Sequence, residues 1–125
     1  MNCKVLVADD DAFITNVVAR KLQNAGLEVI VAVDGQEAYE RAAAEPPDFL
    51  ITDLQMPGMS GLELCARLTV ELPNPLPTIL LTAKGFEIDR SKIGSLPILH
   101  VMTKPFSPRE LLANVQEALG IGAAR

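Results

Sequence analysis

Acidic residues in this sequence stand where short apolar runs end. The segment FLITD (49–53) reaches Asp53 just before a Met-Pro-Gly turn, and the run KVLVA (4–8) is followed by Asp9, Asp10 and Asp11. Each aspartate alone has an ordinary structural explanation, because aspartates often cap helices or form turns. Two carboxylates 4 Å apart repel by about 4 kcal/mol at an effective dielectric of about 20. A site that gathered several of them would therefore need a cation.

Two further polar residues also stand where apolar runs end, and one of them is cationic. Thr82 ends the run TILLT (78–82), and Lys104 follows the run LHVMT (99–103). Alone, the threonine could bond the backbone and the lysine could be a plain surface residue. Together with the aspartates, Lys104 supplies one positive charge and a divalent ion with oxygen ligands would supply two more. Mg²⁺ is typically held by one or two carboxylates, waters and phosphoryl oxygens, so the set indicates phosphoryl chemistry.

The elements that must position these residues are short apolar runs alternating with segments of helical period. We expect five strands, at 4–8, 28–32, 48–52, 78–82 and 99–103. Helices are expected in a stretch that ends at Gly26 and at 35–45, 61–72 and 107–119. In 84–98 the apolar stripe is sparse and Gly94 and Pro97 interrupt it, so we expect a short or irregular helix there.

Strict alternation of strands and helices predicts a doubly wound α/β fold, with a parallel sheet and helices on both faces. Functional groups in such folds collect beyond the carboxyl ends of the strands. Asp53, the acidic cluster 9–11, Thr82 and Lys104 should therefore project from one edge of the sheet.

Length and composition narrow the classes of function. A chain of 125 residues predicts one domain, and 49% hydrophobic with 22% charged residues is typical of a globular protein. The net charge of -5 argues against direct contact with nucleic acid. The sequence lacks an apolar run of 18 residues and its N-terminus lacks the layout of a signal peptide, so we expect a cytoplasmic protein without a membrane segment.

The domain is expected to occupy 1–120, and 121–125 is interpreted as a C-terminal tail of the kind that opens a linker. Cys3 and Cys65 match no metal-ligand spacing and form no disulfide framework, so we expect two buried thiols. Asp11 is expected to cap the helix that follows it.

Taken together, the motifs resemble a response-regulator receiver domain of the CheY-like kind. They stand here as VLVADDD (5–11), FLITDLQMPGMSGLEL (49–64), ILLTAK (79–84) and HVMTKPF (100–106), in family order over about the whole chain. Any one motif is a weak signal, and four in order are a strong one. The resemblance implies a flavodoxin-like fold with five parallel strands in the order 2-1-3-4-5.

The resemblance also implies roles for the matching residues. Asp53 would be the phosphoacceptor, Thr82 would bond a phosphoryl oxygen, and Lys104 would pair with the carboxylate and then with the phosphoryl group. Asp10 would bind Mg²⁺ directly and Asp9 mainly through water. The metal ligands implied by the family are Asp9, Asp10, Asp53 and the backbone carbonyl of Gln55.

A receiver implies a phosphohistidine donor, on a histidine kinase or a histidine phosphotransfer protein, and a downstream target that the sequence does not identify. The domain would catalyse its own phosphorylation and slow dephosphorylation, and would act mainly as a switch; we expect a monomer. In receivers the first helix and the loop after the fifth strand form the docking surface. Phe13 should point to solvent because Ile14 fits the inward stripe, so Phe13 and Phe106 are the expected apolar anchors.

Val101 and the proline-interrupted segment IGSLPILHV (93–101) depart from the family pattern, and rival families fail on specific features. Val101 stands three residues before Lys104, where receivers commonly carry an aromatic residue, and His100 beside it has no acid–nucleophile spacing that would make it catalytic. Gln55 occupies the position where a haloacid-dehalogenase-like phosphatase needs a second acid. GMSG (58–61) misses the G-x-S-x-G elbow, and the sequence has no P-loop. The alternative left open is a receiver-like interaction module that works without phosphorylation.

Overall fold

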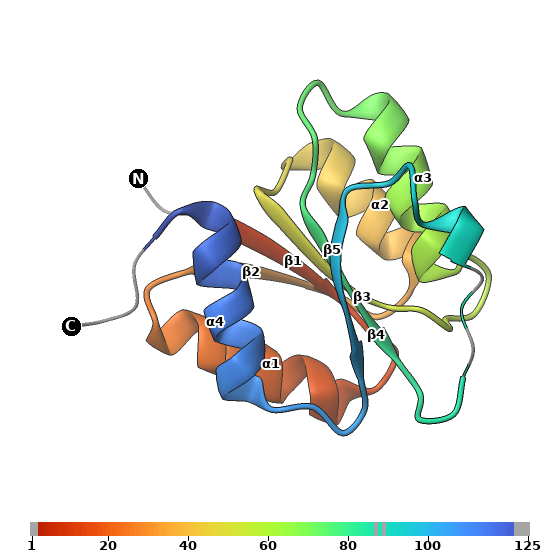
Figure 1. Ribbon diagram of the computed structural model, residues 1–125. Coiled ribbons are helices and arrows are strands. Elements are labelled where there is room, and N and C mark those ends of the chain that lie inside the picture. Colours follow the sequence, from red (N-terminus) through yellow and green to blue (C-terminus); the bar gives the residue numbers. More distant parts are fainter. Residues whose placement is uncertain (1–2, 87, 89, 122–125) are drawn as a thin grey trace.

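A five-stranded parallel sheet and the helices that flank it position the candidate residues (Figure 1). The computed structural model describes residues 3–86, 88 and 90–121. The strands are β1 (Lys4–Ala8), β2 (Glu28–Ala32), β3 (Phe49–Asp53), β4 (Thr78–Thr82) and β5 (Ile98–Thr103). The α-helices among the described residues are α1 (Ala12–Asn24), α2 (Gly35–Ala44), α3 (Gly61–Glu71) and α4 (Pro108–Leu119).

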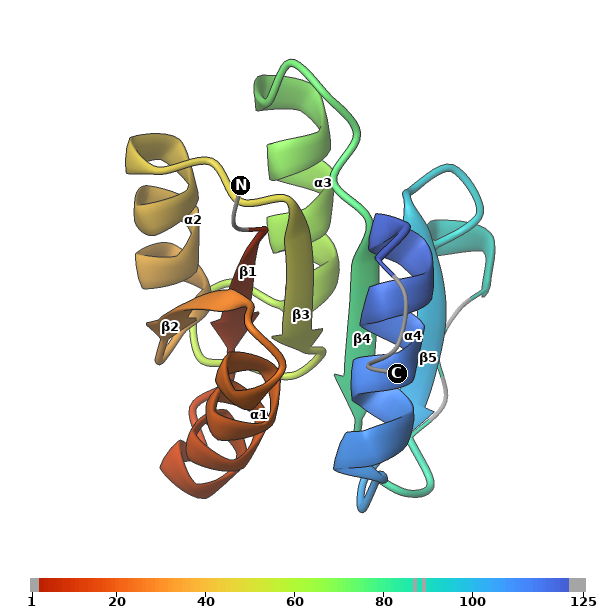
Figure 2. The same cartoon turned by 90° about the vertical axis from the view of Figure 1, so that its left-hand side faces the viewer.

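The strand order is β2-β1-β3-β4-β5, and every neighbouring pair is parallel. Figure 2 shows this order from β2 on the left to β5 on the right. The order confirms the predicted doubly wound, flavodoxin-like α/β fold. Because all five strands are parallel, their carboxyl ends lie at one edge of the sheet.

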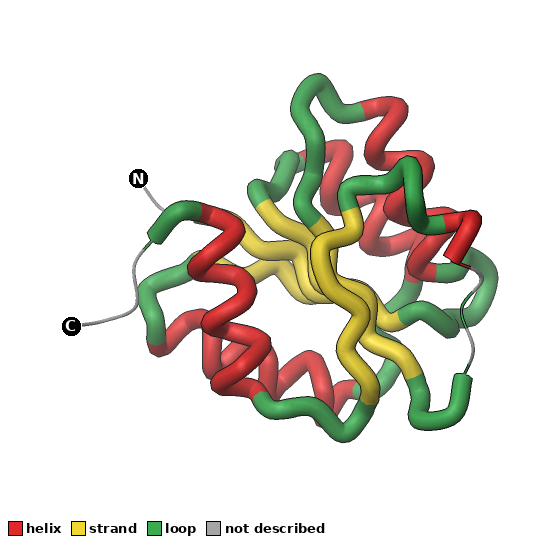
Figure 3. Tube along the Cα trace, in the orientation of Figure 1, coloured by secondary structure: helices red, strands yellow, loops and turns green. Residues whose placement is uncertain are grey.

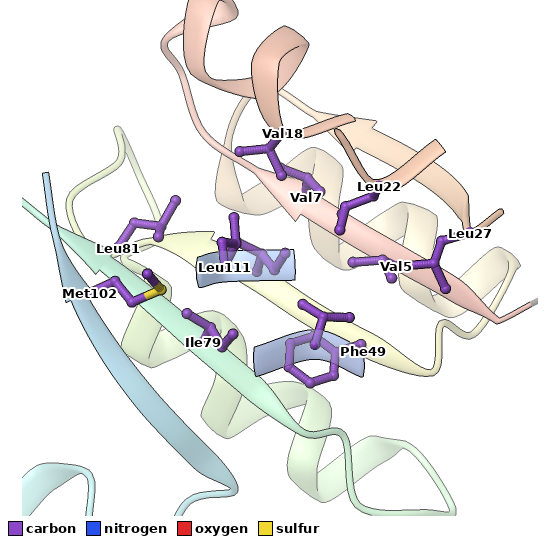
Figure 4. Packing of buried hydrophobic residues seen from close by; sticks show 12 residues of the cluster. Val5, Val7, Val18, Leu22, Leu27, Phe49, Ile79, Leu81, Met102 and Leu111 are labelled. Atoms are coloured by element: carbon purple, nitrogen blue, oxygen red, sulfur yellow. The ribbon is translucent and has the colours of Figure 1, made fainter. Parts of the chain in front are cut away.

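Helices cover both faces of the sheet, with α1 and α4 on one face and α2 and α3 on the other (Figures 1 and 3). Alternation along the strands divides the core between these two layers. In β1, Val5 and Val7 pack in the cluster under α1 and α4, whereas Leu6 and Ala8 pack in the cluster under α2 and α3. Figure 4 shows the first cluster, in which Val18 and Leu22 of α1 and Leu111 of α4 meet the strands. The central strands are thus buried on both sides, as their continuous apolar runs predict.

Local signals in the sequence set the ends of the helices. Asp11 caps α1, as expected, and accepts a hydrogen bond from the Phe13 N–H at 2.9 Å. Such a cap typically contributes about 1 kcal/mol. Gly26 follows α1 with φ of 91°, a left-handed conformation that favours glycine. Ser60 opens α3 through a capping box with Glu63.

The described part of segment 84–98 holds one short 3₁₀ turn, η1 (Arg90–Lys92), in agreement with the expected short or irregular helix. Strand β3 is shifted by one residue from the expected 48–52, so Asp53 is its last residue rather than the residue after it. The pairing of β4 with β5 shifts register between Thr78 and Ile79, an irregularity that the sequence analysis did not predict.

Three details concern burial and the chain termini. Both cysteines are free, and Cys65 is buried as expected. The expectation was wrong for Cys3, which is only partly buried because it precedes β1 at the end of the sheet. Within residues 3–86, 88 and 90–121, the structure has no helix with the length and apolarity to cross a membrane. Of the expected tail 121–125, all but Ile121 lies outside the described residues.

Candidate functional site

The carboxyl edge of the sheet brings together the four segments that the sequence analysis singled out. Asp9 follows β1, Asp53 ends β3, Thr82 ends β4, and Lys104 follows β5. Backbone hydrogen bonds hold these ends in place: the Lys104 N–H donates to the Thr82 carbonyl at 2.8 Å, and the Asp9 N–H donates to the Ala32 carbonyl at 3.2 Å. The predicted meeting of these residues at one edge is therefore present in the structure.

Three carboxylates form an acidic pocket at this edge. Asp9, Asp10 and Asp53 each place a carboxylate oxygen within 4.8 Å of the others. Asp9 is fully buried and Asp53 nearly so, whereas Asp10 is exposed. The pocket is consequently open to solvent on the side of Asp10.

Lys104 lies between the two buried carboxylates. Its Nζ is 2.9 Å from Asp9 Oδ2 and 3.2 Å from Asp53 Oδ1. The other oxygen of Asp9, Oδ1, accepts a hydrogen bond from the Asp11 N–H at 2.9 Å. Both oxygens of Asp9 are therefore engaged by the protein.

The protonation equilibria of Asp53 and Lys104 reflect this crowding. Burial raises the pKa of the Asp53 carboxyl, and the charge of Asp9 raises it further, while Lys104 opposes the shift. Burial alone would lower the pKa of Lys104, but its hydrogen bond to Asp9 and the charges of Asp53 and Asp9 together raise it. Lys104 thus stays positively charged beside a carboxylate that has lost solvation.

Thr82 presents an unpaired hydroxyl at the end of β4. Its Oγ1 is buried and has no hydrogen-bond partner among the residues that the structure describes. A buried polar group without a partner is costly, typically by about 1–3 kcal/mol. An oxygen atom of a ligand bound beside Asp53, the last residue of the neighbouring strand, would be a suitable acceptor for it.

Gln55 lies in the β3–α3 loop (54–60), which joins Asp53 to the next helix. Backbone hydrogen bonds close the loop at its base: the Leu54 N–H donates to the Leu81 carbonyl at 2.8 Å, and the Gly61 N–H donates to the Leu54 carbonyl at 2.9 Å. A Cβ at Gly61 would collide with the Asp53 carbonyl oxygen. Gly61 was not predicted to matter for the site. Its signal in the sequence was a glycine at the first position of a helix, where another residue would be more favourable.

The pocket has the chemistry of a divalent cation site. All three side chains offer hard oxygen donors, and three carboxylates beside one lysine leave excess negative charge. Hard cations such as Mg²⁺ prefer oxygen ligands and bind through one or two carboxylates. The residues present therefore fit Mg²⁺.

The expected docking residues differ in their exposure. Phe13, on the first turn of α1, has 72% of its surface exposed, while Ile14 packs against the core as the stripe predicts. Phe106 is half-buried and also packs against that core. A groove of about 410 Å³ runs beside Phe13 and is also lined by Val17, Arg20 and Pro108, among others.

Comparison with known proteins finds one sequence family, and relatives of known name, that this chain resembles. The sequence profile described as "Response regulator receiver domain" matches residues 5–116. The chain is 40% identical over 119 residues to the alkaline phosphatase synthesis transcriptional regulatory protein PhoP of Bacillus subtilis (strain 168). That match covers 95% of this chain and 49% of the relative, so the chain spans about half of the relative's length.

Solved structures with the same fold include two that are also similar in sequence. The REC domain of AraT, a response regulator from Geobacillus stearothermophilus, is 34% identical with a TM-score of 0.83, covering 96% of this chain and 97% of that one. Vibrio cholerae chemotaxis protein CheY4 is 30% identical with a TM-score of 0.81, covering 94% and 98%.

Proposed function

Because this chain belongs to the response regulator receiver domain family of two-component signalling, we propose that Asp53 accepts a phosphoryl group. Phosphorylation would then switch a partner-binding surface. The observation that carries the proposal is the acidic pocket, in which Asp53 lies 3.2 Å from Lys104 and close to Asp9 and Asp10. A carboxylate can act as a nucleophile when neighbouring groups offset the charge of the incoming phosphoryl group.

In the proposed reaction, a carboxylate oxygen of Asp53 attacks the phosphorus of a phosphohistidine. The new P–O bond forms as the P–N bond breaks, giving an aspartyl phosphate and returning the electron pair to the imidazole of the donor. Lys104 is placed to neutralise negative charge on the phosphoryl oxygens, since its Nζ already contacts Asp53 Oδ1. The buried, unpaired hydroxyl of Thr82 would donate to one of these oxygens once they are present.

The carboxylates Asp9, Asp10 and Asp53 are an acidic triad typical of the Mg²⁺ site of receivers. Asp10 is the exposed member and would bind the ion directly, together with Asp53 and the backbone carbonyl of Gln55. Asp9 would act mainly through water, which agrees with the engagement of both its oxygens by Lys104 and Asp11. When bound, the ion supplies positive charge that offsets the phosphoryl oxygens.

Membership of this family implies a cognate histidine kinase. We propose that the donor, on that kinase or on a histidine phosphotransfer protein, docks on the groove beside Phe13, with Phe106 supporting the adjoining loop. The groove begins on the first turn of α1, directly after the acidic residues 9–11. Its apolar lining and the exposed ring of Phe13 suit the apolar face of a helix.

We also propose how phosphorylation of Asp53 would change the surface of the domain. Phosphorylation adds charge and acceptor oxygens at the end of β3, and Thr82 with the loop after β4 is placed to respond. Val101 occupies the position of the family's common aromatic residue on β5, so the signal would reach this face without that side chain. The Bacillus subtilis relative is named a transcriptional regulatory protein, and control of transcription through a further domain is one output that this chain could serve.

Labelling with a small donor tests the proposed function. We expect intact-mass measurement to find one added phosphoryl group after incubation with acetyl phosphate and Mg²⁺, and none when Mg²⁺ is chelated. Asp53→Asn should stay unlabelled, because an amide lacks the nucleophilic carboxylate. Equal labelling of both proteins would show that Asp53 is not the acceptor, and labelling of neither would favour an interaction module that works without phosphorylation.

A further inference from the structure

The β3–α3 loop (54–60) is in tight contact with the start of α2, a segment that no motif connects with the acidic pocket. Gly35, the first residue of α2, is buried against Met59. A Cβ at Gly35 would lie 2.5 Å from the Met59 carbonyl oxygen and 2.7 Å from the Met59 Cβ. Only glycine at position 35 permits this approach of the helix to the loop.

We infer that Gly35 is a positioning residue: by letting the first turn of α2 rest against Met59, it sets the place of the loop that carries Gln55 and follows Asp53. The inference rests on the proposed function, because it assigns Gly35 a role in placing the proposed Mg²⁺ ligands. Gly35 itself acts only through the loop.

The loop is short and its two ends are bonded to each other, so we expect a shift at Met59 to move the segment between them, which includes Gln55. Its base is fixed by the bond from the Gly61 N–H to the Leu54 carbonyl, and inside the loop the Met59 N–H donates to the Pro57 carbonyl at 3.0 Å. Real Cβ contacts lie beyond 3.0 Å, so a methyl group at Gly35 would displace the Met59 carbonyl by at least about 0.5 Å. Functional groups need placement to within about 0.5 Å, which makes a displacement of this size significant.

The loop has room to yield on the side away from Gly35. A groove of about 640 Å³ lies between the loop, at Leu54, Gln55 and Met56, and the segment after β4, at Phe86 and Ile88. The order β2-β1-β3-β4 places α2 on one side of the loop and the segment after β4 on the other. An alanine at position 35 can therefore push the loop toward the groove. Met56 and Met59 belong to the core cluster under α2 and α3, so we expect the variant to lose some stability as well.

The first experiment measures how the rate of Asp53 labelling by acetyl phosphate depends on Mg²⁺ concentration. For Gly35→Ala we expect the half-saturating Mg²⁺ concentration to rise about tenfold, as residues that support metal ligands typically affect affinity by about 10–100-fold. The maximal rate at saturating Mg²⁺ should stay within about twofold, because Asp53 ends β3 and Lys104 follows β5, so neither is carried by the loop. A purely structural defect would leave the half-saturating concentration unchanged in the folded protein.

Gly26→Ala is the matched control. Gly26 has φ of 91°, so alanine strains the backbone there, but a Cβ meets nothing within 4 Å. Gly26 precedes β2 and lies at the opposite edge of the sheet from the pocket. We expect this variant to lose stability while keeping the wild-type dependence on Mg²⁺. An unchanged half-saturating concentration in Gly35→Ala, or an equal rise in both variants, would overturn the inference.

A measurement on the wild type keeps the inference testable if Gly35→Ala fails to fold. In a Mg²⁺ titration followed by backbone amide NMR, the Gly35 amide should shift together with those of Asp10 and Gln55. Shifts at Asp10 and Gln55 without one at Gly35 would overturn this inference and leave the proposed function standing. No shift at any of the three would overturn the proposed function, and the inference with it.

Discussion

Replacing Lys104 tests whether burial makes its ion pairs with Asp9 and Asp53 important for the stability of the fold. The Nζ of Lys104 lies 2.9 Å from Asp9 Oδ2 and 3.2 Å from Asp53 Oδ1, and the side chains of Asp9 and Asp53 are 0% and 10% exposed. At an effective dielectric of about 20, each contact contributes about 5 kcal/mol of Coulomb attraction, most of which offsets the cost of desolvation.

Lys104→Met removes the cation and leaves two buried carboxylates facing each other. Removing one partner of a buried ion pair typically costs about 3–5 kcal/mol. A quarter of the Lys104 side chain is exposed, so solvent screening places the expected loss at the lower end, about 3 kcal/mol. For a chain of this length, that loss corresponds to a fall in Tm of about 10 °C.

Lys4→Met is the matched control, because it removes an equal charge at an equal distance. The Nζ of Lys4 lies 2.9 Å from Glu45 Oε2, but these side chains are 34% and 50% exposed. Solvent screens such a pair, so the variant should unfold at nearly the wild-type urea concentration. The two lysines share a contact distance of 2.9 Å and differ in burial, and Lys104 also has a second carboxylate partner, Asp53.

The assay is equilibrium unfolding in urea, followed by circular dichroism, in chelator and again in Mg²⁺. The midpoint should fall in Lys104→Met with an unchanged slope, since the surface exposed on unfolding is the same. The loss should be smaller in Mg²⁺, because a bound divalent ion offsets the same carboxylates. Equal losses for both lysine variants, or no loss for Lys104→Met, would refute the argument that burial sets the strength of these contacts.

Single substitutions at the pocket and on α1 give three further expectations. Asp53→Asn should raise Tm at neutral pH without Mg²⁺, because folding raises the pKa of this carboxyl and its charged form therefore destabilises the fold. The gain in Tm should shrink as the pH falls through that raised pKa, and a constant gain at all pH values would contradict this. Asp10→Ala should weaken Mg²⁺ binding about tenfold. In a thermal-shift titration, a Mg²⁺ concentration that stabilises the wild-type fold by about 2.7 kcal/mol should then stabilise the variant by about 1.4 kcal/mol, and an unchanged shift would exclude Asp10 as a ligand. Phe13→Ala should slow phosphotransfer from the cognate donor by about tenfold and leave labelling by acetyl phosphate unchanged, because the small donor needs no docking surface; equal slowing with both donors would exclude the proposed surface.

The sequence by itself determined the class of fold and the edge at which the site lies. Alternating apolar runs and helical stripes are local patterns, and a parallel sheet must bring the carboxyl ends of its strands to one edge. For this reason the convergence of Asp9, Asp53, Thr82 and Lys104 could be predicted without a structure. The strand order came from the family resemblance, because the residues alone do not say which strands are neighbours.

Other features depended on contacts between segments far apart in the chain. Whether Lys104 lies closer to Asp9 or to Asp53, and whether the Thr82 hydroxyl finds a partner, is set by side-chain packing across β1, β3, β4 and β5. The partial burial of Cys3 and Phe106 likewise depends on how the ends of the sheet are covered.

The contact between Gly35 and Met59 is the clearest example of a feature that local sequence patterns do not predict. In the sequence, Gly35 is a glycine after an N-capping aspartate, and nothing local says which backbone it must approach. The approach exists because β2, β1 and β3 lie side by side and α2 and α3 share one face of the sheet. Local patterns specify elements and their ends, whereas distances of a few tenths of an ångström within the site follow only from packing the elements together.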